Sequence, residues 1–472
     1  MKSDSSSFSP FFKIILLLFG AILLCFMGWK NHYPLFHYDS GAYIYPAFEF
    51  YVPKDRPLIY GLFVRLFSLN YSLWGVILAQ GFILSLSLYY YFAHFAHPRR
   101  STILFIFCLF VLTFLTTAPI YVSMISPDIF TSILILNLGL LLFMKQIGKL
   151  DLVIITFLFM LSLAVHNAHF LLGFLVLMLV SIGWLFKRVK ELFPHLSLKR
   201  MGYIWTVFVA AWLLSASVHY LQARTGEHIY GHVFTTGEGG PIFLMSRFSQ
   251  TGILADFLEE HCDQHQYSLC QYRDSLPDDM DFLWKEDSPL YKTGGWKKNE
   301  EEYKGMIFDI LSSPKYLGAF IWKSLETSIA LFFSFDAIQA PVIREIEYAD
   351  RFINKCYPAY RNEYLQSLQN NNKINPMVDR LNRLQEGVFA LTFLLLPFLF
   401  IFSASISKKQ KALYLYFFGF LVLNAFVCAS LSIIDTRYQG RIVWLLCIPF
   451  LLLLFESGLL VDLRRRLFDS DQ

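Results

Sequence analysis

The chain has 472 residues, 56% of them hydrophobic and only 16% charged, with a formal net charge of +4. Soluble domains carry about 25% charged residues, so this composition argues against a soluble globular protein. Lysine and arginine form no stripe with interleaved aromatic residues, and nothing therefore indicates a nucleic-acid partner. The 49 phenylalanines are instead typical of helices that must be apolar on every face in contact with lipid.

Apolar runs long enough to cross a bilayer recur along the chain. They lie near 11–29, 71–95, 102–118, 128–144, 152–166, 168–186, 203–220, 387–405, 411–433 and 441–461. We therefore predict an all-α polytopic membrane protein with about 10–11 transmembrane helices and with short interfacial helices in its exoplasmic loops. The first run is too long for a cleaved signal peptide, so we expect it to be an uncleaved helix.

Basic residues in the short loops predict the orientation, because lysine and arginine are enriched on the cytoplasmic side. These loops lie at 99–100, 145–149, 187–200, 408–411 and 464–466. Both termini are then cytoplasmic, and the alternate loops are exoplasmic. We expect a multi-pass protein of a bacterial cytoplasmic (inner) membrane.

This topology divides the chain into four regions. They are an N-terminal transmembrane module at 1–220 with a first exoplasmic loop at 30–57, an exoplasmic loop region at 221–315, an interfacial or exoplasmic helical segment at 316–386, and C-terminal transmembrane helices at 387–472. The region 221–315 is too irregular to predict an independent domain. Within it, a disulfide between Cys262 and Cys270 is left open, because spacing alone does not show that the geometry closes.

A weaker apolar run at 316–336 carries Lys323 and Glu326. Either this segment lies in the membrane interface, as its charges favour, or it spans the membrane with a further crossing hidden in 337–386.

The exoplasmic ends of the predicted helices collect most of the unusual polar residues. Asp39 sits among aromatic residues at the membrane surface, where desolvation would raise its basicity and suit a general base; the alternative is a helix cap. Arg56 lies in a charged turn that could face an anion. Asp128 opens a predicted spanning helix, either as a cap or as a functional carboxylate.

Two more groups of polar residues lie at the same predicted surface. His166 and His169 interrupt an apolar stretch, as a buried structural pair or as the lining of a polar cavity. Arg437 and Arg441 precede the last helix on the side where positive charge is not favoured, which suggests a lipid phosphate as partner. The alternatives are headgroup contact by snorkelling and pairing with Asp435.

At this point the sequence resembles the GT-C glycosyltransferases, multi-span enzymes that use polyprenyl-phosphate sugars, such as protein O-mannosyltransferases and lipid A aminoarabinose transferases. Four segments carry the resemblance: Tyr38-Asp39-Ser40-Gly41-Ala42-Tyr43, Arg56-Pro57-Leu58-Ile59-Tyr60-Gly61-Leu62, Ser312-Ser313-Pro314-Lys315-Tyr316-Leu317 and Arg437-Tyr438. Many members have two adjacent acidic residues in the first loop, whereas here Ser40 follows Asp39. A divalent metal (Mg²⁺ or Mn²⁺) is therefore left open, and no other cofactor is expected.

The resemblance implies an inverting displacement at the anomeric carbon of a polyprenyl-phosphate-linked sugar, with an exoplasmic glycan, lipid or protein as acceptor. Asp39 would be the base, Asp128 would orient it, and Arg437 and Arg441 would hold the lipid phosphate. Substrate contacts are also expected from the remaining polar candidates, which are His37, Tyr43, Arg56, His166 and His169.

Two other classes remain open. A polyprenyl-linked glycan ligase or polymerase also has long exoplasmic loops with arginine and histidine, but it would not need Asp39. A lipid or solute transporter should show repeated halves and charged residues at mid-bilayer, neither of which is evident in the sequence.

Overall fold

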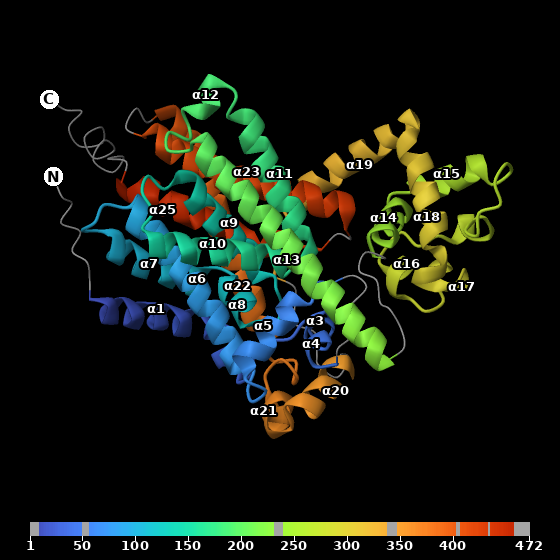
Figure 1. Cartoon of the computed structure of the whole chain (residues 1–472), viewed down its shortest axis with the longest axis horizontal. Helices are drawn as coiled ribbons and strands as arrows, with labels where there is room; N and C mark the ends of the chain where they lie inside the picture. The colour runs from blue at the N-terminus through green and yellow to red at the C-terminus, as the bar shows by residue number, and fades with distance from the viewer. Residues whose placement is uncertain are drawn as a thin grey trace.

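The computed structural model describes residues 9–49, 56–230, 239–337, 347–402, 406–432 and 435–456. These residues form helices and no β-strand, with an isolated bridge between Leu35 and Met124. Figure 1 shows a large helical bundle with a smaller group of helices to one side of it.

The first half of the chain supplies most of the bundle. Its helices are α1 (Pro10–Leu24), α2 (Phe26–Asn31), α3 (Ser40–Ile44), α4 (Pro46–Glu49), α5 (Ile59–Ser68), α6 (Trp74–Phe95), α7 (Ser101–Leu115), α8 (Ala118–Ser123), α9 (Ile129–Phe143), α10 (Lys149–Ala164), α11 (Asn167–Gly183), α12 (Lys187–Lys190) and α13 (Leu198–Tyr230).

The second half first forms the smaller group and then returns to the bundle. The smaller group contains α14 (Gly239–Gln250), α15 (Ile253–His261), the 3₁₀ helix η1 (Cys270–Ser275), α16 (Asp281–Trp284), α17 (Pro289–Lys292), α18 (Gly295–Ser312) and α19 (Pro314–Phe332). The return is made by α20 (Glu347–Cys356), η3 (Pro358–Tyr360), α21 (Arg361–Gln366), α22 (Asn375–Phe402), α23 (Lys408–Leu431), α24 (Arg437–Val443), η4 (Trp444–Leu446) and α25 (Cys447–Glu456).

Each predicted apolar run overlaps a helix, but not every helix is long enough to cross a bilayer. Within the described residues, four stretches are long and apolar enough to do so: Trp74–Phe95, Leu198–Thr225, Lys408–Leu431 and Arg437–Glu456. Other apolar helices, such as α1, α7, α9 and α11, are shorter. The chain therefore has the helices of a membrane protein, and the number of 10–11 crossings stays a prediction.

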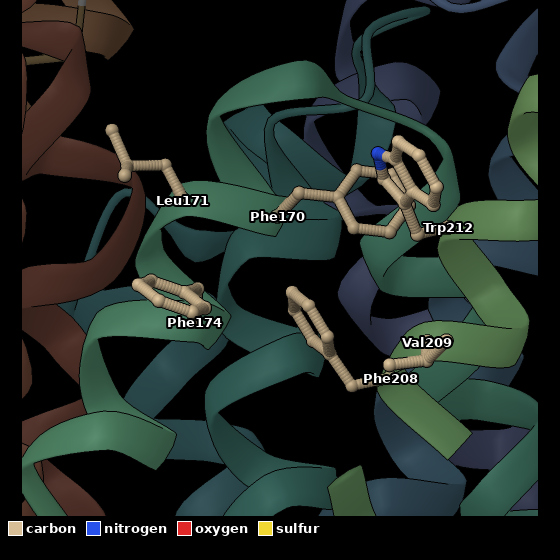
Figure 2. Close-up of a pocket in the computed structure, with 6 residues that line it drawn as sticks. All are labelled: Phe170, Leu171, Phe174, Phe208, Val209 and Trp212. Atoms are coloured by element: carbon tan, nitrogen blue, oxygen red, sulfur yellow. The ribbon is translucent and has the colours of Figure 1, made fainter. Parts of the chain in front are cut away.

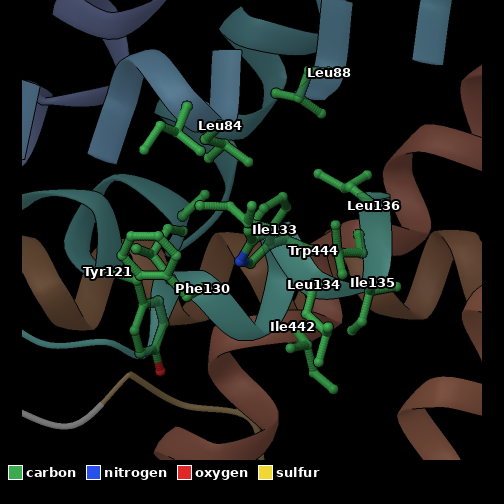
Figure 3. Close-up of a cluster of buried hydrophobic side chains, with 14 of the residues drawn as sticks. Leu84, Leu88, Tyr121, Phe130, Ile133, Leu134, Ile135, Leu136, Ile442 and Trp444 are labelled. Carbon is green, nitrogen blue, oxygen red and sulfur yellow. The ribbon is translucent and has the colours of Figure 1, made fainter. Parts of the chain in front are cut away.

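Helix α9 is the centre of the bundle. All of its residues from Ile129 to Phe143 are buried, as expected for a helix that is apolar on every face. Leu84 of α6 and Trp444 of η4 belong to the buried cluster around it (Figure 3). Because α9 is enclosed by protein, the position of its N-terminal end is fixed by the packing of its neighbours.

Several basic residues of the loops that the sequence assigns to the cytoplasmic side contact other segments of the bundle. Arg200 donates a hydrogen bond to the carbonyl oxygen of Met144, directly after α9. Arg100 donates to the carbonyl oxygen of Phe455 at 2.6 Å, and Lys408 forms an ion pair with Glu191 at 2.8 Å. Arg200 and Arg100 thus contact the C-terminal ends of α9 and α25, where a cation complements the helix dipole.

Helices α14 to α19 form a unit with a hydrophobic core of its own, which differs from the irregular loop that the sequence suggests. Its fully buried residues include Ile242, Phe257, Phe282 and Tyr303. The prediction left a disulfide open, and the structure contains one between Cys262 and Cys270. The unit joins the bundle where Leu331, near the end of α19, packs on Cys428 and Ala429 of α23.

The disulfide gives a testable prediction about cysteine reactivity. In membranes of a Cys356→Ser variant, which keeps only buried free cysteines, a polyethylene-glycol maleimide should add nothing before reduction. After mild reduction of this variant, the maleimide should add two labels. In a double variant that also carries Cys262→Ser, it should add one label, to Cys270, without reduction. Gel mobility measures the number of labels. Two labels before reduction would show that the bond is absent and that this unit is not in an oxidising compartment.

Candidate functional site

The backbone of the first loop is held in place just before the candidate residues His37 and Asp39. The side-chain amide of Gln369 donates to the carbonyl oxygen of Phe36 at 2.6 Å and accepts from the Phe36 N–H at 3.0 Å. The N–H of Gln369 in turn donates to Asn31 Oδ1 at 2.7 Å. All of these groups are buried, so the loop cannot move here without leaving polar groups unsatisfied.

Asp39 lies between two arginines that come from distant parts of the chain. Its Oδ1 accepts from Arg56 Nη2 at 2.7 Å, and its Oδ2 accepts from both terminal nitrogens of Arg437 at 3.2 Å. Asp39 precedes α3, but its side chain makes no capping hydrogen bond. Of the two interpretations of Asp39, the helix cap is therefore wrong.

Asp128 precedes the buried helix α9 and forms the deepest ion pair of the site. Its Oδ1 accepts from Arg441 Nη1 at 2.7 Å, and its Oδ2 accepts from the Ser126 hydroxyl at 2.7 Å. Arg437 lies 4.0 Å from the same carboxylate. Asp128 makes no capping hydrogen bond from its side chain, so here too the cap is replaced by ion pairing.

Arg437 and Arg441 lie one helical turn apart on α24, and the ring of Tyr438 lies near both guanidinium groups, at 5.2 and 5.1 Å. The hydroxyl of Ser132 donates to the carbonyl oxygen of Arg441 at 2.6 Å, which joins α24 to α9. Gly440 stands between the two arginines. A Cβ there would lie 2.8 Å from the carbonyl oxygen of Phe335, so the close approach of the chain requires glycine.

Together these residues form a buried charge network, which we define as Arg56, Arg437 and Arg441 with Asp39, Asp128 and Asp435. Asp435 joins it through a 3.1 Å contact with Arg437 Nε. Three cations face three carboxylates, so the network carries no net charge while His37 is neutral. The exposed fraction of the side chains rises from 1% at Arg441 to 23% at Asp39. Asp39 is therefore the most accessible member of the network.

The pKa values of Asp39 and His37, two titratable groups of the first loop, are shifted in directions that the sequence did not indicate. Burial alone would raise the pKa of Asp39, but the charges of Arg56 and Arg437 outweigh burial and hold this pKa well below its usual range. The expectation that Asp39 gains basicity from its setting is therefore wrong for the structure as it stands. Burial, reinforced by Arg437, lowers the pKa of His37 to about 4.

His37 is correspondingly placed as a neutral acceptor. Its Nδ1 lies 2.8 Å from Nη1 of Arg437 and also accepts from the Asp39 N–H at 3.3 Å. Since an arginine can only donate, this nitrogen carries no proton.

The two histidines of the second candidate group lie beside the network and have structural partners. His166 Nδ1 caps α11 by accepting from the Ala168 N–H at 3.2 Å. His169 is fully buried, with one ring nitrogen 2.7 Å from the Thr131 hydroxyl and the other 2.6 Å from the Ser162 carbonyl oxygen. His169 thus fits the structural interpretation, whereas His166 is only half-buried.

Tyr43 links the histidines to the network. The guanidinium group of Arg56 lies 4.9 Å from the centre of the Tyr43 ring, and the ring of His166 lies 6.2 Å from it on centres. The rings of His166 and His169 are stacked at 5.0 Å. All the candidate residues named from the sequence are thereby brought into one continuous group of contacts.

An apolar groove of about 470 Å³ begins next to the two histidines. It runs between α11 and α13 and is lined by Phe170, Leu171, Phe174, Phe208, Val209 and Trp212 (Figure 2). Phe170 directly follows His169, so one end of the groove lies at the N-terminal turn of α11. The groove contains almost no polar surface, and it therefore suits a hydrocarbon chain.

Metal ligands are not gathered in the same way. Within the described residues, no three side chains of histidine, cysteine, aspartate or glutamate are placed to hold a metal ion. Asp39 and Asp128 are each engaged by arginine. The carboxylates of the site therefore do not fit Mg²⁺ or Mn²⁺.

Sequence reasoning did not find Gln369 or Gly440. Gln369 lies in a polar, asparagine-rich stretch, and Gly440 lies beside Arg441; neither position has a local pattern that marks it. Asp435 was considered only as a partner for an arginine, and it has that role.

Replacement of Gly440 by alanine should destabilise the site. The added Cβ would lie 2.6 Å from the Tyr121 hydroxyl and 2.8 Å from the Phe335 carbonyl oxygen, and such overpacking costs about 1–3 kcal/mol. Thermal unfolding of the purified protein in detergent measures the loss. The control is Gly419→Ala in α23, where an added Cβ meets no atom within 4 Å. Equal stability of both variants would contradict the described packing of α24.

The lowered pKa of His37 predicts a pH dependence of stability. In the unfolded chain His37 binds a proton below about pH 6.5, but in the folded protein only below about pH 4. Its contribution is therefore complete above pH 6.5 and is lost as the pH falls toward 4, by about 3 kcal/mol. The ion pairs of Asp39 persist over this window, because its pKa lies lower still.

The melting temperature should consequently fall less between pH 7 and 4.5 in His37→Gln than in the wild type. The control is His32→Gln, because His32 is exposed. If the melting temperature of His37→Gln fell with pH as steeply as that of the wild type, His37 would not be held neutral in the folded protein.

Comparison with known proteins identifies no relative: no family model, no curated protein and no solved structure matches this chain.

Proposed function

We propose that this protein is a membrane glycosyltransferase that moves a sugar from a polyprenyl-phosphate donor to a hydroxyl group of an exoplasmic acceptor, with inversion at the anomeric carbon. The observation that carries the proposal is the charge network. A partly exposed carboxylate lies between two arginines, and an apolar groove starts next to His169, which contacts Arg56 through His166 and Tyr43. A lipid phosphate and an acceptor hydroxyl need these groups in this proximity.

The phosphate of the donor binds to Arg56 and Arg437. These are the two arginines that hold Asp39, and their side chains are 12% and 8% exposed. Arg441 is less suitable, because only 1% of its side chain is exposed and it is already paired with Asp128 at 2.7 Å. Of the two arginines named from the sequence, Arg437 thus binds the phosphate, whereas Arg441 holds α24 in place.

Asp39 becomes a base when the donor arrives. The phosphate competes with Asp39 for Arg56 and Arg437, and an added negative charge nearby raises the proton affinity of the released carboxylate. Asp39 then takes the proton of the acceptor hydroxyl while the acceptor oxygen bonds to the anomeric carbon. The bond from that carbon to the phosphate oxygen breaks with its electron pair, and the two arginines stabilise the leaving phosphate.

The groove between α11 and α13 holds the first isoprene units of the donor. It is apolar, and it starts at His169 next to the group of contacts that leads through His166 and Tyr43 to Arg56. A lipid tail placed there brings its phosphate to the arginines without taking the hydrocarbon out of an apolar environment.

The disulfide supports an exoplasmic site. Bonds such as Cys262–Cys270 persist in oxidising compartments and are rare in the cytosol. The unit that contains it meets the bundle at Leu331 and Cys428, against which Tyr438 packs. Tyr438 in turn lies near both Arg437 and Arg441, so the unit that carries the disulfide contacts the bundle next to the charge network.

The proposal is tested with the full chain in nanodiscs and a panel of radiolabelled polyprenyl-phosphate sugars. Asp39→Asn should reduce turnover at least a thousandfold while donor binding is kept. Arg56→Lys should raise KM for the donor about tenfold, because lysine cannot reproduce the planar contact of a guanidinium. The matched control is Arg361→Lys, which alters an arginine–aspartate pair outside the site and should have no effect.

Proton NMR of the first product should show the opposite anomeric configuration to the donor. Equal turnover by Asp39→Asn and the wild type would refute the role of Asp39, and failure to consume any donor with crude cell-envelope acceptors present would refute the proposed function.

A further inference from the structure

The unit formed by α14 to α19 exposes a group of aromatic side chains. We call Trp284, Tyr291 and Trp296 the aromatic platform. The side chains of Trp284 and Tyr291 are 47% and 38% exposed, and Trp296 is half-buried. They come from α16, α17 and the start of α18, and α17 packs against both α16 and α18. Phe243 packs against both tryptophans, with ring centres 6.3 and 5.8 Å away.

The platform is rigid, because each exposed ring is attached to a firmly buried neighbour. Phe282 and Leu283, which precede Trp284, are fully buried in the core of the unit. The Tyr291 hydroxyl donates to the carbonyl oxygen of Leu283 at 3.1 Å and accepts from Trp296 Nε1 at 3.4 Å. The rings are thus presented at the surface by a packed framework.

The two tryptophan rings form a shallow angle that suits a sugar. Their centres are 5.9 Å apart and their planes are inclined by 39°. Exposed aromatic surface is unfavourable in water, and a contiguous group of such rings usually marks a binding site. A pyranose ring has an apolar face of C–H groups that can stack on an indole, and its edge of hydroxyl groups requires polar partners.

The rim of the platform supplies those partners and argues against a lipid surface. The exposed charged residues near it in sequence are Asp278, Asp279, Asp281, Glu286 and Asp287 together with Lys285, Lys292 and Lys298. Lys285 lies 3.7 Å from Asp281 and 3.8 Å from Asp287. Carboxylates accept hydrogen bonds from sugar hydroxyls. Charges of both signs are interspersed, so the rim is not the basic cluster that binds anionic headgroups, and it offers the hydroxyl groups of a neutral glycan both acceptors and donors.

From these observations we infer that the aromatic platform binds a neutral oligosaccharide of the acceptor, with pyranose rings stacked on Trp284 and Trp296. The identity of the oligosaccharide as part of the acceptor rests on the proposed function. Binding of an oligosaccharide to the platform, however, requires neither the donor nor Asp39. The unit would thereby hold a growing or polymeric glycan while its end reaches the charge network.

The test measures binding of neutral tetrasaccharides of glucose, mannose, galactose and N-acetylglucosamine to the full chain in nanodiscs by isothermal titration calorimetry. At least one should bind, and Trp284→Ala should weaken its affinity at least tenfold. Trp322→Ala is the matched control, because Trp322 is a 67% exposed tryptophan on α19 outside the platform, and it should bind as the wild type does. Asp281→Asn should weaken binding without removing an aromatic ring.

Two results would overturn the inference. One is that no tetrasaccharide binds, or that Trp284→Ala binds as well as the wild type. The other concerns tryptophan fluorescence in nanodiscs that contain brominated lipids. If these lipids quench the wild type more than Trp284→Ala, Trp284 contacts lipid and the platform lies in the membrane. Because Asp39→Asn should bind the tetrasaccharide normally, a failure of the proposed catalytic role would leave this binding result intact, and the two failures are distinguishable.

Discussion

The buried ion pair between Asp128 and Arg441 determines how the rest of the site is built. Its two side chains are almost inaccessible, and removal of one partner of such a pair costs about 3–5 kcal/mol, because the other charge is left without compensation. The pair joins the start of the central helix α9 to α24. Since Arg437 lies on the same face of α24, the pair also sets the position from which Arg437 reaches Asp39.

Electrical neutrality is the second property that shapes this site. Three carboxylates balance three guanidinium groups, so the resting protein can bury them without a large unpaired charge. An incoming anion must therefore replace a resident carboxylate or remain weakly bound. Asp39 is the member that can be replaced at least cost, because it alone is substantially exposed. In the proposed reaction, substrate binding and activation of the base are therefore one event.

The sequence predicted the helices and the grouping of the candidate residues better than it predicted their chemistry. Apolar runs showed where helices lie, whereas the orientation predicted from the basic loops stays a prediction. The role of Asp39 depended on Arg437, which lies 398 positions away, so residue type could not distinguish a cap, a free base and an ion-paired carboxylate. The same is true of Gln369, whose partner Phe36 is 333 positions away.

The helical unit at 239–332 was underestimated for a related reason. Three of its helices, α15, α16 and α17, have only nine, four and four residues, too few to display a sustained helical pattern. A clear one lies in α18, in its buried Tyr303, Met306 and Ile310. The disulfide between Cys262 and Cys270 depends on local geometry that the spacing of two cysteines cannot reveal.

The shortness of the inner helices has a consequence for the surrounding membrane. Helices α1, α7 and α9 each have 15 residues, so each is about 22 Å long, whereas the hydrocarbon layer of a bilayer is about 30 Å thick. In the predicted topology the basic end of α9 is level with one set of headgroups, and Asp128 then lies below the other set. A bilayer meets such a mismatch by thinning, and lipid headgroups are drawn down around the protein. A lipid-borne phosphate would then arrive at the depth of the arginines because the membrane surface itself dips toward them.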